Sequence, residues 1–214
     1  MNSALSQSKI TVANGSVRGY YNGDDNWNAG EYEYYNLDGD ITGYNLRKIT
    51  WDGNQFGIES GYEHHPVFFV TWFGANAFAK HYGYKLPSEQ EWEKAARGNT
   101  GYKFPWGNSI SGENANYWDS GDPYDNGTTP IGYYSGENHN GYQTQDSPSP
   151  FGVYDMAGNV WEWTDSFFSG TSNHRVARGG SFGSYLIYIY CYERHHYPSN
   201  STDVNIGFRC VKLN

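Results

Sequence analysis

Apolar residues recur at helical spacing in a segment in the first half of the chain. In TWFGANAFAKHYG (71–83), Trp72, Ala75, Ala79 and Tyr82 follow one another at intervals of three or four residues. This spacing places them on one face of an α-helix. Gly83 is the residue type that most often ends a helix. The pattern therefore predicts a helix over about 71–82 that buries one side.

A second helix is predicted directly afterwards, in KLPSEQEWEKAARG (85–98). Ser88 and Glu91 have the spacing of a capping box, in which each side chain binds the other residue's backbone N–H. Trp92, Ala95 and Ala96 form its apolar side, and Gly98 ends it. These two segments are the only ones that the pattern predicts to be helical.

The remaining segments read as short strands and loops. Residues 1–65 are rich in Gly, Asn, Asp and Tyr, and their acidic cluster (Asp24, Asp25, Asp38 and Asp40) is interpreted as solvated turn carboxylates. Residues 67–70 indicate a short strand or an extended entry into the helix, 101–150 an irregular region, and 206–210 a terminal strand. A long irregular region needs something besides a strand ladder to hold it, and a bound cation would serve.

The most aromatic run is FGSYLIYIYCYERHHY (182–197). Its alternation of tyrosine with β-branched residues favours a buried strand. Gly183 and Pro198 are loop signals, and tyrosine is also the residue that binding surfaces use most. Both interpretations are open from the pattern alone.

Composition limits the classes of protein that the chain can belong to. Its 214 residues suffice for one domain, and 40 of them are Tyr, Phe or Trp, which predicts an aromatic core. The net charge of −9 argues against a nucleic-acid partner, because no basic stripe is present to neutralise phosphates. Neither a signal peptide nor a run of membrane-spanning length is visible, so no location is predicted. Cys191 and Cys210 could form one disulfide or remain two buried thiols.

Two groups of oxygen ligands are candidates for calcium. One comprises the carboxylates of Asp155 and Glu162 with carbonyl groups near Gly158 and Val160. The other lies in the irregular region and comprises Asn116, Asp119, Asp122 and Asp125. Local caps and Asx-turns explain the same residues equally well. The adjacent pairs His64–His65 and His195–His196 cannot share one face of a regular element, and they are interpreted as solvated or hydrogen-bonded.

Five motifs in a fixed order carry a family resemblance. PVFFVTWFGANAFAKHYGYKLPSEQEWEKAARG, FPWGN, FGVYDMAGNVWEWT, RVARGGSF and NIGFRC together resemble the formylglycine-generating-enzyme (sulfatase-modifying factor) family over about 60–214. The resemblance implies an α+β fold of the C-type-lectin-like class, with two helices, small antiparallel sheets and long irregular loops. It also implies structural calcium at Asp155, Gly158, Val160 and Glu162, and a second site near Asn116, Tyr117 and Asp125. We expect one domain over 1–214, with 1–60 an atypical N-terminal elaboration.

The oxidase branch of this family uses two cysteines five positions apart to bind copper and to oxidise a substrate cysteine. This chain has Cys191 in the corresponding region, and Cys210 lies beyond it in GFRC. The required pair is therefore missing, and we expect a protein that is not an enzyme. A copper oxidase acting on a substrate cysteine, or a non-catalytic structural member of the family, are the alternatives.

The chain is also similar to the variable proteins of diversity-generating retroelements, whose diversified segment lies between an RGGS-like and a GFR-like motif. Mutagenesis of adenines in AAC codons yields Tyr, Ser, Ile, Cys and His, among others, but never Trp, Met, Gln, Lys or Glu. Residues 182–192 and 195–197 contain only permitted types, Glu193 is the exception, and no Asn occurs in the run. The resemblance implies a variable, ligand-binding region over 178–210 that recognises a protein or cell-surface ligand without inserting into a membrane. Its expected ligand-binding residues are Phe182, Ser184, Tyr185, Ile187, Tyr188, Tyr190, Tyr192, His195, His196, Tyr197 and Asp203. Most of this run should be exposed, with Leu186 and Arg194 as anchors.

Overall fold

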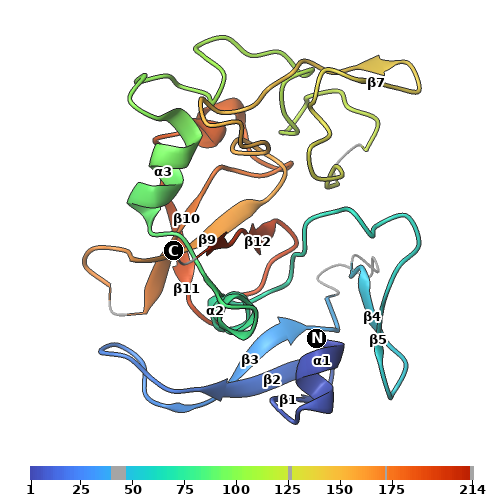
Figure 1. The fold of residues 1–214 in the computed structure, drawn as a ribbon, viewed down its shortest axis with the longest axis vertical. Coiled ribbons are helices and arrows are strands. Elements are labelled where there is room, and N and C mark those ends of the chain that lie inside the picture. Colours follow the sequence, from blue (N-terminus) through green and yellow to red (C-terminus); the bar gives the residue numbers. More distant parts are fainter. Residues whose placement is uncertain (40–46, 125–126, 172, 213–214) are drawn as a thin grey trace.

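The computed structural model describes residues 1–39, 47–124, 127–171 and 173–212. Two sheets organise it, a three-stranded antiparallel sheet at the N-terminal end and a four-stranded sheet formed late in the chain (Figure 1). The elements of the first part are α1 (Asn2–Ser6), β1 (Ile10–Ala13), β2 (Ser16–Tyr21), β3 (Gly30–Asn36), β4 (Ile49–Trp51) and β5 (Phe56–Ile58). Strands β1, β2 and β3 are neighbours in that order, and β4 with β5 forms a separate hairpin.

The four-stranded sheet has the order β11-β10-β9-β12. Its strands are β9 (Trp161–Phe167), β10 (His174–Arg178), β11 (His195–Pro198) and β12 (Ile206–Phe208). The pairs β9–β10 and β10–β11 are antiparallel, whereas β12 runs parallel to β9. A 3₁₀ turn, η1 (Leu186–Ile189), lies between β10 and β11, and β13 (Val211–Lys212) pairs with β6 (Tyr84–Lys85). Above this sheet in Figure 1 the chain is mostly loops, with one small hairpin of β7 (Asn138–His139) and β8 (Tyr142–Gln143).

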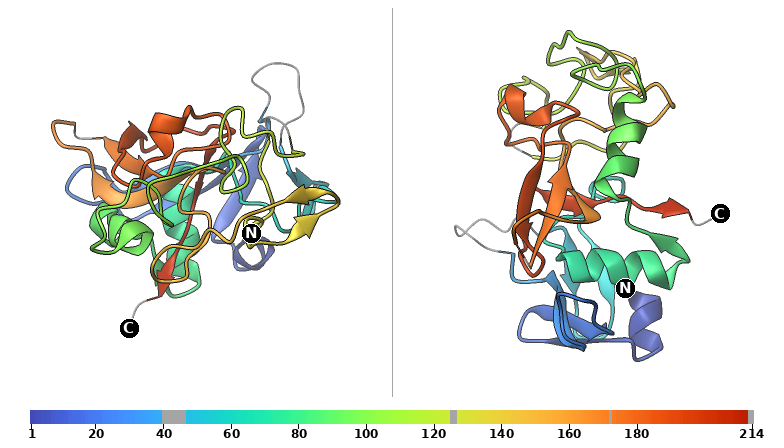
Figure 2. Two further views of the ribbon diagram at one scale, coloured as in Figure 1. Left: turned by 90° about the horizontal axis from the view of Figure 1, so that it is seen from above. Right: turned by 90° about the vertical axis from the view of Figure 1, so that its left-hand side faces the viewer.

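Helix α2 (Trp72–His81) lies between the two sheets (Figures 1 and 2). The Thr71 side chain caps it by accepting a hydrogen bond from the Gly74 N–H. A Cβ at Gly74 would stand 2.1 Å from the Tyr34 carbonyl oxygen, so only glycine lets the helix approach β3 this closely. The helix ends at His81 with Gly83 just beyond it in the left-handed region, as the spacing predicts.

Helix α3 (Glu89–Arg97) packs against the four-stranded sheet. Both hydrogen bonds of the predicted capping box between Ser88 and Glu91 are present. Trp92 and Ala96 are buried, and the Trp92 indole N–H donates to the Glu162 carboxylate of β9 at 2.6 Å. The helix is thus fixed to the sheet by a polar contact as well as by its apolar face.

One hydrophobic cluster runs through both sheets and α2. Its members come from Ile10 in β1 to Ile206 in β12. Aromatic contacts build it, among them Phe73 stacked on Tyr32 at 4.2 Å between ring centroids. The first 60 residues therefore contribute to the same core as the C-terminal sheet.

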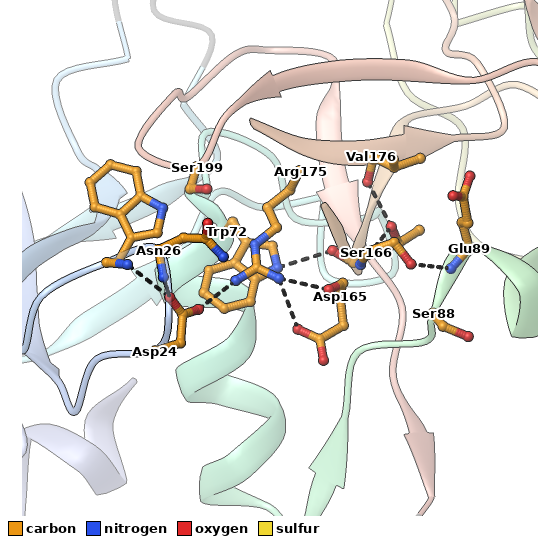
Figure 3. Close-up of polar contacts among 12 residues, drawn as sticks. Asp24, Asn26, Trp72, Ser88, Glu89, Asp165, Ser166, Arg175, Val176 and Ser199 are labelled. Carbon is orange, nitrogen blue, oxygen red and sulfur yellow. Dashed lines mark hydrogen bonds and ion pairs between the residues drawn. The ribbon is translucent and has the colours of Figure 1, made fainter. Parts of the chain in front are cut away.

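Arg175 in β10 joins the N-terminal segment to the four-stranded sheet (Figure 3). Its guanidinium donates to Asp24 at 2.8 Å and to the Asp165 carbonyl at 2.6 Å, and it lies over the rings of Trp72 and Phe167. The interpretation of Asp24 as an exposed turn carboxylate is confirmed, and the structure adds its pairing with Arg175. It closes a turn, accepting from the backbone N–H groups of residues 26 and 27, and it also pairs with a buried cation.

Several local predictions differ from the structure. Residues 67–70 form no strand. Val70 makes a single bridge to Tyr35, and Phe69 has a positive φ of 58° that interrupts extended backbone. The terminal strand ends at Phe208, and two short helical elements, α1 and η1, were not predicted. The buried-strand interpretation of the tyrosine run is wrong for 182–192, which is a loop with one 3₁₀ turn. Asp40 lies outside the described residues.

Candidate functional site

The segment 182–192, called here the aromatic loop, has its backbone tied to the surrounding scaffold. The Phe182 N–H donates to the Asn159 carbonyl, and the Ser184 carbonyl accepts from the Trp118 N–H at 3.0 Å. The Cys191 N–H donates to the Lys103 carbonyl at 2.7 Å. These bonds reach three separate segments of the chain, so the course of the loop is determined by groups outside it.

Arg178 at the end of β10 binds the backbone at the end of the aromatic loop. It is fully buried, and it donates to the carbonyls of Cys191 and Tyr192 at 2.8 and 3.3 Å. Its charge is balanced by Glu93 of α3 at 2.6 Å. A buried guanidinium that binds two carbonyls fixes the backbone without any contribution from the neighbouring side chains.

Two side chains of the loop enter the interior. Ile189 is 0% exposed and packs with Phe104 and Ala157, and Cys191 lies in a cluster with Trp92 and Met156. Ser184 is also buried, and its hydroxyl accepts a hydrogen bond from the N–H of Ser181, which directly precedes the loop. Leu186, the expected anchor, is instead 37% exposed, and Ile189 takes that role.

Most of the other side chains of the loop point to solvent. Tyr185, Ile187 and Tyr188 are 64, 54 and 46% exposed, and Trp118 from a neighbouring loop lies 6.4 Å from the Tyr185 ring. We call the exposed set the aromatic face: Trp118, Tyr185, Leu186, Ile187, Tyr188 and Tyr192. Phe182 and Tyr190 are half-buried, and Tyr190 packs edge-on against Phe104. Trp118 was missed by sequence reasoning because it lies 67 positions before Tyr185, the residue that it faces, and no local pattern links them.

The remaining predicted ligand-binding residues lie on or after the edge strand β11. His195 is exposed, with its ring 5.4 Å from Trp161. His196 is half-buried and stacks on Phe168, and burial and the neighbouring His174 and Arg194 lower its pKa. Tyr197 is half-buried beside Trp163, and burial raises its pKa. Arg194 is an anchor, as expected, because it donates to both carboxylate oxygens of Glu89.

Asp203 is half-buried in the segment that leads to β12. Its backbone carbonyl accepts from the Phe69 N–H at 2.9 Å, and its carboxylate accepts from the Asn205 N–H at 3.4 Å. Both contacts are within the chain, and they position the turn before β12.

The residues of the first predicted calcium site have partners within the protein. The Glu162 carboxylate accepts two hydrogen bonds from Arg209, at 2.5 and 2.6 Å, and one from Trp92. A calcium ion at Glu162 would have to displace this guanidinium, so the contacts do not fit a site that includes Glu162. The Asp155 carboxylate accepts from the Gly132 N–H at 2.6 Å, and burial raises its pKa. Burial outweighs the Gly132 hydrogen bond and the charge of Arg209, both of which lower the pKa of this carboxylate.

Gly158 and Asn116 are in contact, next to Asn159, whose carbonyl accepts from the Phe182 N–H of the aromatic loop. The Gly158 position would bring a Cβ within 2.1 Å of the Asn116 carbonyl oxygen, which also accepts from the Asn159 N–H. The Asn116 side chain donates to the Gly127 carbonyl, and Val160 is buried. Asp125 lies outside the described residues. Calcium thus stays a prediction, and within residues 1–39, 47–124, 127–171 and 173–212 no group of three or more His, Cys, Asp or Glu is placed to hold a metal.

The two cysteines are free thiols. Cys191 is fully buried, and burial raises its pKa to about 12. Cys210 is half-buried, and burial raises its pKa to about 11. Both are therefore held as protonated thiols at neutral pH, whereas metal binding and nucleophilic attack require thiolates.

Comparison with known families gives one match over nearly the whole chain. Residues 9–213 match the sulfatase-modifying factor enzyme 1-like domain. The chain belongs to this family. Among relatives in the sulfatase-modifying factor family, the formylglycine-generating enzyme of Streptomyces coelicolor is 35% identical over 192 residues, which cover 78% of this chain and 59% of that protein. The serine/threonine-protein kinase pkn1 of Chlamydia caviae is 35% identical over 173 residues, 72% of this chain and 25% of the kinase.

The structure of this chain is similar to that of Treponema denticola variable protein 1, with a TM-score of 0.57. The sequence identity is 18%, and the match covers 94% of this chain and 97% of that one. This likeness confirms the expected C-type-lectin-like α+β fold. The chain spans about a quarter of the kinase and a little over half of the formylglycine-generating enzyme. Among the described residues, no helix has the length and apolar character needed to cross a membrane.

Proposed function

We propose that this member of the sulfatase-modifying factor family is a non-catalytic ligand-binding protein that presents the aromatic face to a protein or cell-surface partner. The observation that carries the proposal is that the backbone of the aromatic loop is held by the scaffold, whereas most of its side chains are exposed. Its backbone is bound by Arg178, Asn159 and Lys103, whereas the side chains at 185–188 and 192 point outward. Side chains on such a loop can be exchanged without removing a contact that holds the backbone.

The chemistry of the face suits recognition of another macromolecule. Tyrosine and tryptophan offer large, rigid contact areas together with a hydrogen-bonding group, at little cost in side-chain entropy. Residues of these types supply most of the energy at protein interfaces, with about 2 kcal/mol or more lost on truncation of each central one. The exposed Tyr185, Tyr188 and Trp118 supply that chemistry at one place on the surface.

Diversification of the loop is part of the proposal. The loop lies between RVARGGS and NIGFR and contains residue types that adenine mutagenesis of AAC codons permits. The test is genomic. The proposal requires a reverse-transcriptase gene nearby and a near-repeat of codons 182–205 that differs from them at adenines. If neither is present, diversification is refuted, and an invariant binding face is what remains.

An oxidase is the second candidate, because a relative at 35% identity is named a formylglycine-generating enzyme. The buried Cys191, with a pKa near 12, and the sequence distance of 19 residues to Cys210 oppose it. Incubation with copper, oxygen and a cysteine-containing sulfatase peptide decides the matter. Formation of an aldehyde on the peptide would establish the oxidase and refute the non-catalytic proposal.

The third candidate, a structural subunit, would need the tyrosines of the loop in the core. Tyr185 and Tyr188 are exposed and Tyr190 is half-buried, which opposes a role in packing for the first two. Replacement of Tyr185, Ile187 and Tyr188 together by serine should leave the unfolding midpoint nearly unchanged if they serve recognition.

A further inference from the structure

Two histidines on neighbouring strands of the C-terminal sheet meet at their ring nitrogens. The Nδ1 atoms of His174 in β10 and His196 in β11 are 2.7 Å apart. Neither belongs to the aromatic face. Strand register explains the meeting, since His174 pairs with Pro198 and His196 with Val176, which makes the two histidines diagonal neighbours.

We propose that His174 and His196 form a two-histidine site for a divalent late transition metal, copper(II) or nickel(II), bound through both Nδ1 atoms. The inference is independent of the proposed function. The prediction that His196 is solvated or hydrogen-bonded is confirmed by its bond to His174, a partner 22 residues away that only strand pairing reveals.

A hydrogen bond sets the present distance between the two nitrogens, and this distance also suits one kind of ion. Metal–imidazole bonds are about 2.0 Å long, so two nitrogens at a right angle around an ion stand about 2.8 Å apart. A tetrahedral arrangement would separate them by about 3.3 Å. The observed 2.7 Å lies close to the first value, which is the geometry that copper(II) and nickel(II) prefer. The ion would replace the proton that the two nitrogens now share.

Phe168 holds the His196 ring and the His174 backbone. The His196 ring stacks on Phe168 at 3.8 Å between centroids, and the His174 carbonyl accepts from the Phe168 N–H at 3.0 Å. The nearby Arg194 is bound by both carboxylate oxygens of Glu89, so its charge is balanced. Both histidines are half-buried, which leaves access for an ion and for water in its remaining positions.

The full chain, without an affinity tag and after treatment with a chelator, is titrated with nickel(II) by calorimetry at pH 7.5. The variants are His174→Ala and His196→Ala, and the matched control is His195→Ala, which removes the adjacent histidine on the same strand. We expect one ion per chain for wild type and for the control, and at least tenfold weaker binding for the other two variants. No binding to wild type, equal binding by all variants, or equal loss in the control would overturn the proposal.

A second measurement needs no variant and therefore does not depend on how a variant folds. Copper(II) is paramagnetic and broadens the NMR signals of the nuclei nearest to it. Substoichiometric copper(II) should broaden the imidazole signals of His174 and His196 before those of the other five histidines of the chain. Earlier broadening of any of those five would place the ion elsewhere and refute the site.

Discussion

Two isoleucines in the same 3₁₀ turn provide a matched test of the aromatic loop. Ile187 is 54% exposed, whereas Ile189, two residues later, is 0% exposed. The substitutions Ile187→Ala and Ile189→Ala remove the same three carbon atoms from the same element. They differ only in whether those atoms lie in solvent or in the core.

The expected costs follow from burial. Three buried carbon atoms correspond to about 2.4 kcal/mol of transfer free energy, and the cavity left behind adds to this. Ile189 is packed by Phe104 and Ala157, and its Cγ2 atom would lie 2.4 Å from a Cβ at Gly180. We therefore expect Ile189→Ala to reduce the free energy of unfolding by about 3 kcal/mol. Ile187→Ala should change it by no more than about 0.5 kcal/mol.

Urea unfolding followed by tryptophan fluorescence measures both values, and a thermal scan gives an independent check. For a chain of this size about 3 kcal/mol corresponds to a fall of about 6–12 °C in the melting temperature. Similar losses for both variants would refute the division of the loop into an anchored backbone and a free outer face. So would a larger loss for Ile187→Ala than for Ile189→Ala.

Three further predictions test the scaffold. Arg175→Met breaks the contacts of the buried Arg175 side chain to Asp24 and Asp165, and it should lower the free energy of unfolding in urea by about 3–5 kcal/mol. The control Arg194→Met should lower it by at most about 1 kcal/mol, because the Arg194 side chain is more exposed. Equal costs would contradict the joining role of Arg175. Burial acts to raise the pKa of Asp24, but hydrogen bonds from Asn26, Tyr21 and Trp27 outweigh it and hold that pKa below its usual value. The stability that Asp24 confers is therefore complete above its unfolded pKa of about 3.9 and is lost as pH falls through the folded pKa. The difference in free energy of unfolding between wild type and Asp24→Asn should therefore shrink in acid. A difference independent of pH would show that the charge is irrelevant. Both cysteines should resist iodoacetamide at pH 8 in the folded protein and react in urea, because burial raises the pKa values of Cys191 and Cys210 to about 12 and about 11. Mass spectrometry would measure the alkylation. Rapid alkylation of Cys191 in the folded state would contradict its burial.

Local patterns predicted helices α2 and α3, but they could not resolve the aromatic loop. Both helices were found because their caps and apolar faces are encoded within a few residues, as with Ser88 and Glu91. The loop was ambiguous because the groups that hold it, Arg178 and Lys103, are distant in sequence from the backbone that they bind. Alternation of tyrosine and isoleucine looks the same in a strand and in a 3₁₀ turn flanked by extended residues.

The site residues show the same limit. Exposure of Tyr185 and Tyr188 was anticipated from the position of the run between two motifs, whereas the roles of Leu186 and Ile189 were not. Glu162 was expected to be a calcium ligand, and the structure gives its carboxylate to Arg209, a residue 47 positions later. Contacts over such separations depend on the completed topology, which no local pattern contains.

The parallel strand β12 has a consequence for how new versions of the loop are tolerated. It follows the aromatic loop in the chain and completes the core by placing Ile206 beside Trp161 of β9. During synthesis the core stays open until the ribosome has passed the loop, because contacts between distant segments form late in folding. A loop sequence that kept β12 from docking would leave apolar surface exposed to proteases. If the loop is diversified as proposed, cellular quality control would remove faulty versions before they met any ligand, and the surviving repertoire would consist of loops that let β12 dock.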